Sequence, residues 1–172
     1  PATAVGLTRE QALEGTPRVR INTPSLSGSI NLPGGRIDDV SLNQYRETIR
    51  AGSPTISLLS PAGSPHPYFV ESGLVAQPGS NVLAPRPDTL WTADRQTLTP
   101  EQPVTLTWDN GQGLIFRRII SVDNSYMFTI RNVVENNTGQ PVTLFPYALT
   151  SRVGKPRTEG YIVLHEGYLG VV

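Results

Sequence analysis

The sequence of 172 residues contains no cysteine, and its 14 basic residues are balanced by 14 acidic ones. The absence of cysteine excludes disulfides, thiolate metal sites and cysteine-based catalysis. Lys155 is the only lysine, and the arginines are scattered apart from the adjacent pair Arg117 and Arg118. A nucleic-acid-binding domain would show a basic patch or stripe, because phosphate contacts dominate its affinity. The composition therefore argues against nucleic acid as a partner.

Long hydrophobic runs are missing as well. No stretch approaches the ~20 apolar residues that a membrane-spanning helix needs. Residues 1–5 lack the charged segment and the apolar run of an intact signal peptide. If the parent protein is bound to a membrane, we therefore expect its anchor to lie outside this chain. Charged residues make up only 16%, which argues against highly charged disorder and for one folded domain.

A period of two, typical of half-buried β-strands, runs through most of the chain from residue 18 onward. Residues 76–89, rich in proline and glycine, are predicted to form a long loop. At least ten short strands with turns between them indicate an antiparallel sandwich or barrel. The predicted strands are 18–22, 26–30, 36–42, 55–59, 67–75, 104–108, 114–121, 126–134, 142–145, 161–164 and 168–172.

Three local patterns make sharper predictions. Thr8 and Gln11 fit a capping box, which predicts about two helical turns or a frayed linker turn in the same place. Asn110-Gly111 predicts a hairpin with a type I′ turn, because that turn needs positive φ at both central positions. Arg117-Arg118 breaks the alternation of its strand, which favours a β-bulge or an edge position.

Candidate catalytic residues are sparse. His66 and His165 lie far apart in the sequence and give no zinc-ligand spacing. The chain has no nucleophile elbow and no glycine-rich phosphate loop. His165 beside Glu166 could do acid–base work, but a strand end followed by a turn is the favoured interpretation.

Other candidates also have ordinary structural explanations. Asp38 and Asp39 are successive strand residues, so their carboxylates should point to opposite faces. Trp91 and Trp108 could act as sugar platforms, although Trp108 alternates with core positions and is expected to be buried. Residues 136–138 match a glycosylation sequon but are more simply a turn. We therefore assign no catalytic, cofactor-binding or metal-binding residue, expect no cofactor, and leave the partner-binding residues open.

With the strands placed, the sequence resembles the periplasmic domain of the YidC membrane-protein insertases of the alphaproteobacterial type. The order and spacing of four segments carry the resemblance, rather than any single motif. These segments are Arg18–Pro24 with Leu26–Ile30, Gly35–Leu42 with Tyr45–Thr48, Leu58–Phe69, and Leu106–Gly113 continuing through Phe116–Arg118, Tyr126–Phe128 and Tyr147 to Gly160–Tyr161 and His165–Gly167.

The resemblance implies an all-β fold, an antiparallel β-supersandwich similar to sugar mutarotases and related carbohydrate-binding domains. It implies a position in the periplasm, as part of a bacterial inner-membrane protein whose insertase activity resides in membrane helices absent from this chain. It also implies a non-catalytic interaction or scaffold module. Its partners would be accessory subunits of the Sec translocon and inserting membrane proteins.

The same resemblance divides the chain into a linker at residues 1–16, which would hold the short helix, and the periplasmic domain at 17–172. The family's domain continues with more strands and a helical stretch. We therefore expect a domain truncated on its C-terminal side, with Val172 inside it. Missing strands would leave an open sheet edge, and open edges invite pairing with another chain, so self-association is expected.

Two other functions stay open at this stage. One is a carbohydrate-binding or mutarotase-like domain, which would need His66, His165 and Glu166 to converge in one cleft. Fold analogy alone is a weak argument for it. The other is a chaperone-like surface that holds extended polypeptide by adding a strand to a sheet edge. That surface is compatible with the scaffold module.

Overall fold

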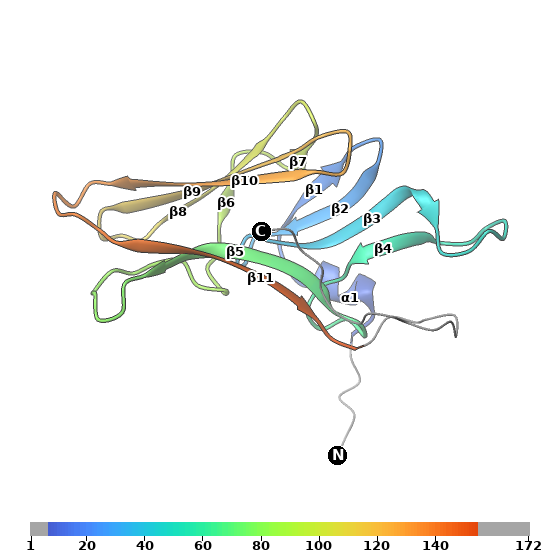
Figure 1. Ribbon diagram of the computed structural model, residues 1–172, viewed down its shortest axis with the longest axis horizontal. Helices are drawn as coiled ribbons and strands as arrows, with labels where there is room; N and C mark the ends of the chain where they lie inside the picture. Colours follow the sequence, from blue (N-terminus) through green and yellow to red (C-terminus); the bar gives the residue numbers. More distant parts are fainter. Residues whose placement is uncertain (1–6, 155–172) are drawn as a thin grey trace, which may run out of the picture.

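The computed structural model describes residues 7–154, which form two β-sheets that face each other as a sandwich (Figure 1). Every strand pair is antiparallel except β1 with β7, so the predicted all-β antiparallel sandwich is confirmed. The elements are α1 (Arg9–Glu14), β1 (Arg18–Asn22), β2 (Leu26–Asn31), β3 (Arg36–Arg46), β4 (Thr55–Leu59), β5 (Tyr68–Ala76), β6 (Thr92–Ala93), β7 (Thr97–Leu98), β8 (Val104–Asp109), β9 (Leu114–Val122), β10 (Phe128–Asn136) and β11 (Leu144–Arg152).

The larger sheet has seven strands in the order β11-β5-β3-β2-β1-β7, with β4 also paired to β3. The smaller sheet has the order β10-β9-β8-β6. The chain passes from the smaller sheet to the larger one through the turn between β10 and β11 (Figure 1). Strands β10 and β11 are consecutive in sequence, and each lies at the edge of its own sheet.

The core lies between the sheets and follows directly from the alternation of the sequence. In β1, Val19 and Ile21 are fully buried, whereas Arg20 between them is exposed. In β9, every second residue of nine is buried, including Phe116 and Ile120. Each large apolar side chain that is fully buried contributes about 1.5–3 kcal/mol, so these two strands supply much of the stability.

The helix and its capping box are confirmed. The Gln11 amide donates to Thr8 Oγ1 at 3.2 Å, and the Thr8 amide donates to Gln11 Oε1 at 2.9 Å. Helix α1 buries none of its residues, so its position depends on side-chain contacts with the sheet. Among the described residues, no helix is long and apolar enough to cross a membrane.

The predicted hairpin at Asn110 is confirmed, but the type I′ turn is wrong. Tyr126 is the only non-glycine residue with positive φ in residues 7–154, so Asn110 does not adopt the required conformation. Its side chain builds a wider loop instead, because Oδ1 accepts the amides of Gln112 and Leu114 at 2.8 and 3.0 Å. Positive φ falls on Gly111 and Gly113.

Strand boundaries differ from the prediction mainly around proline and at strand ends. Strand β11 continues from Leu144 through Pro146 to Arg152, although the prediction covered only 142–145. Proline is tolerated there because β11 is an edge strand, where a missing amide donor leaves no ladder bond unmade. The short strands β6 and β7 were not predicted, the loop at 76–89 is confirmed, and the predicted strands 161–164 and 168–172 lie outside the described residues.

Candidate functional site: buried charges and an exposed edge strand

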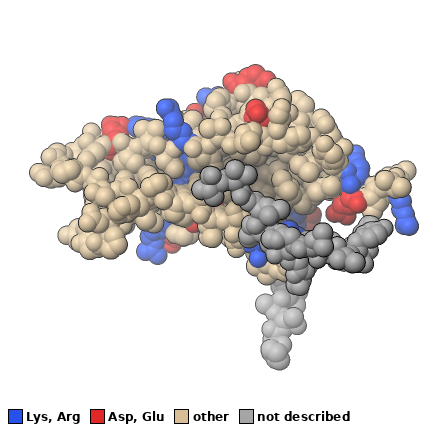
Figure 2. Space-filling model, viewed as in Figure 1, with Lys and Arg blue, Asp and Glu red and all other residues tan. Residues whose placement is uncertain are grey.

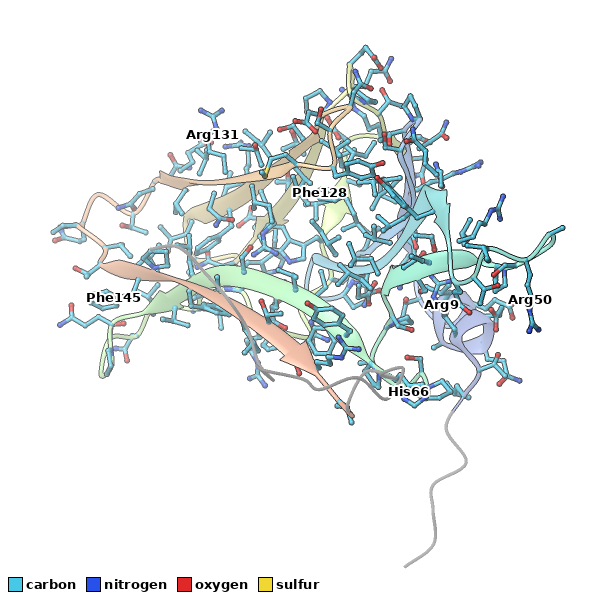
Figure 3. All side chains as sticks on the ribbon, turned by 45° about the vertical axis from the view of Figure 1, so that its right-hand side comes forward. Arg9, Arg50, His66, Phe128, Arg131 and Phe145 are labelled. Atoms are coloured by element: carbon cyan, nitrogen blue, oxygen red, sulfur yellow. The ribbon has the colours of Figure 1, made fainter. Side chains whose placement is uncertain are left out.

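The predicted histidine site is only partly described by the structure. His66 lies exposed on the connection between β4 and β5, at the periphery of the molecule (Figure 3). His165 and Glu166 lie outside the described residues. Within 7–154, no three His, Cys, Asp or Glu side chains gather as a metal site would require.

Asp38 and Asp39 do not point to opposite faces, so that prediction is wrong. Ser29 of β2 pairs with Asp39, and Ile30 pairs with Ile37, which leaves Asp38 as the extra residue of a β-bulge. A bulge re-aims side chains and so breaks the simple alternation. Gly28 lies beside this bulge with φ of 152°, and a Cβ there would lie 2.0 Å from the Asp39 carbonyl oxygen.

The two carboxylates belong to one buried assembly, the outer-face network, on the side of the larger sheet away from the core. Arg18 forms an ion pair with Asp38, and its Nε donates to Ser29 Oγ at 2.7 Å. The Ser29 hydroxyl donates to Asp39 Oδ2 at 2.6 Å, and Asp39 also forms an ion pair with Arg9 of α1. The network thus ties the helix to the sheet, as Figure 3 shows for Arg9.

The outer-face network is better suited to holding structure than to proton transfer. Burial raises the pKa of Asp38, and this effect outweighs the lowering by Arg18. Each carboxylate nevertheless has its own arginine. Paired carboxylates perform acid–base chemistry when the site pushes their pKa values apart and leaves one proton free to move, and neither carboxylate here is free.

A second buried carboxylate, Glu71 of β5, is held from two sides. Arg36 Nε donates to Glu71 Oε2 at 2.6 Å, and the Tyr147 hydroxyl donates to Oε1 at 2.7 Å. Burial and the neighbouring Glu71 carboxylate raise the pKa of Tyr147 to about 12. The Tyr147 ring lies against Gly73, where a Cβ would approach Cε1 to 2.6 Å. These contacts fix β11 onto β5.

The expected bulge or edge position at Arg117-Arg118 is wrong. Strand β9 pairs continuously with β8 on one side and β10 on the other. Arg118 occupies an inward position of the regular alternation, between Leu106 and Asn132 on the neighbouring strands, and is 3% exposed. The inward position of Arg118 was not predicted, because a charged residue at a core position interrupts the alternation of apolar and polar residues even when the strand itself is regular.

Carbonyl oxygens and an aromatic ring accommodate the buried guanidinium. Arg118 Nη1 donates to the carbonyls of Gly34 and Gly35 at 3.2 and 2.9 Å, and Nε donates to Asn132 Oδ1 at 3.2 Å. The guanidinium carbon lies 5.0 Å from the centre of the Trp91 ring, a cation–π distance. Burial lowers the pKa of Arg118.

The tryptophans are not exposed platforms for a sugar ring. Trp91 is 3% exposed, whereas Trp108 is half-buried and packs against Phe116 with ring centres 5.5 Å apart. The sequence had favoured burial of Trp108, and the structure buries Trp91 more completely. At the sequon, the turn is confirmed, because the Thr138 amide donates to Asn136 Oδ1 at 3.0 Å.

An open groove of about 240 Å³ lies between the long loop and the connections of β8 to β9 and β10 to β11. Its described lining residues include no aromatic ring. The Asn110 amide in it is already engaged, since Nδ2 donates to the Leu83 carbonyl at 3.0 Å. The lining residues are Asn81, Val82, Asn110, Gln112, Leu114, Thr138, Gln140, Pro141 and Val142.

Two neighbouring strands present exposed apolar side chains, which we call the apolar stripe: Val75 of β5, and Phe145 and Leu149 of β11. Phe145 and Val75 are directly opposite each other on β11 and β5, and the three side chains are 46–48% exposed. Phe145 and Leu149 share the face opposite to Leu144, which packs against the core. Because β11 pairs only with β5, its other edge has no partner among the described strands. No partner-binding residue was predicted from the sequence, and the apolar stripe was not among the predicted features.

Comparison with known sequences decides the family. The family model described as the YidC periplasmic domain matches residues 18–172. The chain belongs to the YidC periplasmic domain family. It is 60% identical over 166 residues to a membrane protein insertase YidC of Beijerinckia indica, covering 96% of this chain and 28% of that protein.

More distant relatives agree with this assignment. The YidC insertase of Bradyrhizobium diazoefficiens is 52% identical, covering 94% of this chain and 26% of that protein. That of Granulibacter bethesdensis is 48% identical, covering 90% and 27%. The chain therefore spans about a quarter of the length of the YidC relatives that it matches. The predicted resemblance and the periplasmic location are confirmed.

On the face of the domain shown in Figure 2, charged residues do not form a surface of one sign. On the face shown in Figure 2, blue and red side chains are scattered over the surface. This agrees with the balanced composition and the zero formal net charge. An exposed surface that binds a partner is therefore better sought among apolar groups.

Proposed function

We propose that this domain is a non-catalytic interaction or scaffold module of a membrane-protein insertase. Its partners would be accessory subunits of the Sec translocon, or membrane proteins during insertion. The apolar stripe on β5 and edge strand β11 carries the proposal, because exposed apolar side chains that gather on one face mark sites of protein contact. Membership of the YidC periplasmic domain family supports it.

The apolar stripe is better suited to side-chain contacts with a partner than β11 is to pairing with an added β-strand. Pro146 lies between Phe145 and Tyr147 and has no amide hydrogen to donate to an incoming strand. Phe145 and Leu149 project from the same face and expose apolar surface, and aromatic side chains such as that of Phe145 are enriched at protein interfaces. We therefore expect the partner to bind this face with a folded surface or an amphipathic segment. Addition of a strand from the partner to the edge of β11 is the less favoured mode of binding.

The buried polar groups favour a scaffold over an enzyme. The carboxylates of Asp38, Asp39 and Glu71 are each committed to an arginine. His66 is exposed on a loop, without a second histidine beside it in the part of the chain that the structure describes. These arrangements stabilise the fold, and among residues 7–154 they leave none of these three carboxylates free to act as a general base.

The proposal is tested by using the 172-residue chain as bait for detergent-solubilised inner membranes, with mass spectrometry as the readout. The double variant Phe145→Ser/Leu149→Ser removes two members of the stripe. Ile49→Ser is the matched control, because Ile49 is fully exposed but lies on the distant turn between β3 and β4. Urea unfolding of each variant establishes that it is folded.

We expect the wild-type chain and Ile49→Ser to recover Sec accessory subunits or insertase substrates. The double variant should lose at least about tenfold of this recovery, which corresponds to about 1.4 kcal/mol. Equal recovery by all three proteins would reject the stripe as the contact site. Failure of the folded wild-type chain to recover any such protein would reject the proposed function itself, and sugar binding in a titration would favour the carbohydrate-binding alternative.

A further inference from the structure

The hairpin that joins β3 to β4 projects from the sandwich. Figure 1 shows it extending beyond the sheets, at the end of the molecule opposite to the turn between β10 and β11. Residues 44–52 are all exposed, whereas Ser53 after them is buried. Arg50 of the hairpin and Phe145 of the apolar stripe lie at opposite ends of the molecule (Figure 3). A contact made by the hairpin would therefore be separate from a contact made by the stripe.

The tip of the hairpin is held in shape by its own hydrogen bonds. The Thr48 amide donates to Ser53 Oγ at 2.9 Å, and the Ser53 amide donates to the Arg50 carbonyl at 3.1 Å. Gly52 supplies the positive φ of 80° in this turn. The exposed side chains thus stand on a formed loop, and a partner does not need to order the loop before binding it.

The side chains at the tip combine one aliphatic group with two cations. Ile49 is fully exposed, and Arg50 directly follows it. Arg46 precedes Ile49 by one turn of chain, and its Nη1 donates to the Ser53 carbonyl at 3.4 Å. Among residues 7–154 neither arginine forms an ion pair. Glu47 is the only acidic residue of the hairpin, so the two arginines leave it with a net positive charge.

Tyr45 adds an aromatic ring beside the tip. About half of its surface is exposed, and its ring lies 6.3 Å from the ring of Tyr126 at the turn between β9 and β10. A single exposed aliphatic residue is ordinary on a soluble protein. Here it stands on a projecting tip beside a tyrosine and two unpaired arginines. Tyrosine favours the interface between membrane and water, and arginine pairs with lipid phosphates there.

We infer that the tip of the β3–β4 hairpin contacts the surface of an anionic phospholipid bilayer, with Ile49 among the headgroups and Arg46 and Arg50 on the phosphates. A bilayer is within reach, because domains of this family lie in the periplasm as part of an inner-membrane protein. A folded protein surface would cover one side of a projecting tip unless it had a matching pocket. Headgroups surround such a tip and cover a side chain that is exposed on every side. The arginines keep the tip in the headgroup layer, because charge is costly in hydrocarbon.

The contact is weak on its own and gains its effect from tethering. Each arginine near an anionic surface strengthens binding about fivefold, and a shallow isoleucine adds about twofold. The total is weaker than the binding of a single myristoyl chain, whose association constant is about 10⁴ M⁻¹. Attachment to a membrane raises the effective concentration of the hairpin at the bilayer. The contact would therefore orient the domain rather than anchor it, with the apolar stripe at the far end.

Binding is measured by sedimentation of the 172-residue chain with vesicles at millimolar lipid. One set of vesicles contains phosphatidylcholine alone, and the other contains phosphatidylcholine and phosphatidylglycerol in equal amounts. The wild-type chain should partition more strongly into the anionic vesicles, and added salt should reduce the difference. Arg50→Gln should lower partitioning into the anionic vesicles about fivefold and leave the neutral vesicles unaffected. Arg131→Gln is the matched control, because Arg131 is exposed on β10, outside the hairpin (Figure 3).

Ile49→Trp tests the same contact by a gain of binding. Tryptophan favours the membrane interface, so partitioning into both kinds of vesicle should rise, and brominated lipid should quench the added fluorescence. Leu90→Trp is the control. Leu90 is also exposed, but it bridges Pro33 ahead of the start of β3, whereas the hairpin follows the end of that strand. Urea unfolding establishes that each variant is folded.

Three results would overturn the inference. The first is a folded wild-type chain that does not partition into anionic vesicles. The second is an equal loss of binding in Arg50→Gln and Arg131→Gln, which would indicate general attraction of charge rather than a contact at the hairpin. The third is vesicle-bound Ile49→Trp without quenching. If the chain did not bind vesicles and Ile49→Ser lost a protein from the pulldown described above, the hairpin would be a protein contact and the assignment to lipid would be wrong.

Discussion

The outer-face network lies on the side of the larger sheet away from the core, whereas Arg118 points inward from the smaller sheet, and the two places bury charge in different ways. In the network, two arginines meet two carboxylates, and Ser29 joins the pairs by hydrogen bonds. At Arg118, the charge faces peptide carbonyls, one side-chain amide and an aromatic ring. The first arrangement depends on partner residues from α1, β1 and β3. The second depends mainly on backbone geometry at one turn.

Because of this difference, removing an arginine leaves a different kind of buried group without a partner in each of the two places. Removing an arginine from the network leaves a buried carboxylate without its opposite charge, which is among the most destabilising changes in a protein core. Removing Arg118 leaves carbonyl oxygens without donors, and the cost is that of unsatisfied neutral groups. The two regions should therefore respond unequally to the same type of substitution.

The largest predicted effect compares Arg18→Met with Arg118→Met at pH 7. Arg18→Met should lower the free energy of unfolding by about 3 kcal/mol, because Asp38 is 3% exposed and loses its ion-pair partner. Arg118→Met should cost about 1 kcal/mol, because neutral acceptors lose their donors and the contact with the Trp91 ring is lost, but no buried charge is left unpaired. Urea unfolding measures both values.

The pH dependence of Arg18→Met sharpens the same comparison. Burial already raises the pKa of Asp38 in the native protein, and loss of Arg18 should raise it further. A raised carboxyl pKa means that the native state holds its proton longer than the unfolded chain, so stability is lost as the pH rises through that pKa. The penalty of Arg18→Met should thus be smaller at pH 4 than at pH 7. A penalty independent of pH would contradict the predicted unpaired charge.

An intermediate effect on stability is predicted for Gly28→Ala. This variant should disrupt the β-bulge that brings Asp38 and Asp39 into the outer-face network. The added Cβ would lie 2.0 Å from the Asp39 carbonyl oxygen, and backbone atoms cannot rotate away. We expect a loss of about 2 kcal/mol in the free energy of unfolding, from overpacking and an unfavourable φ.

Gly15→Ala is the matched control for the bulge variant. A Cβ at Gly15 meets no atom within 4 Å, and its φ of −73° suits any residue. Its stability should therefore change little. Equal urea midpoints for the two variants would show that the close approach of β2 and β3 at Gly28 is not required.

The smallest predicted effect concerns Tyr147 at alkaline pH. Its pKa is about 12 in the folded protein, against about 10 in an unfolded chain. The native state therefore retains the proton longer, and the resulting stability is complete below pH 10 and declines as the pH rises toward 12. In Tyr147→Phe this decline should be weaker.

Absorbance at 295 nm provides an independent check of the same group. One tyrosine of the native wild-type chain should ionise late, and that late step should be absent from Tyr147→Phe. Tyr68→Phe is the control, because Tyr68 lies on β5 and its ring packs beside Arg152 rather than against a carboxylate. If the late ionisation step were lost in Tyr68→Phe and kept in Tyr147→Phe, the raised pKa would belong to Tyr68, and the prediction for Tyr147 would be wrong.

Much of the fold was predictable from the sequence because alternation reports which side of a strand is buried. Strand β1 and the apolar positions of β9 follow that rule directly. The capping box at Thr8 was predictable because its bonds are local. Where a structure depends on a neighbouring strand, the sequence pattern failed. The bulge at Asp38 is defined by its register against β2, and Arg118 is solvated by a turn more than eighty residues away.

The candidate surface was less predictable than the fold. Phe145 and Leu149 have the spacing of a buried strand face, and nothing local indicates that no layer covers them among the described residues. Pro146 further obscured the strand, because proline within a run argues against a central strand. Which edge of a sheet lacks a partner is a property of topology and is not visible from residue spacing.

The attachment of α1 has a mechanical consequence. None of the helix residues is fully buried, although Arg9, Ala12 and Leu13 are half-buried, and the side-chain hydrogen bonds from the helix to the sheet run from Arg9 to Asp39 and Ser41. Tension applied to residues ahead of the helix would reach these contacts before it reached β1, which is clamped by ladders on both sides. An ion pair ruptures over a short extension and reforms when the force is released. Under tension from this end, the contacts of the helix should therefore break and reform before the strand pairing of the sheet is disrupted.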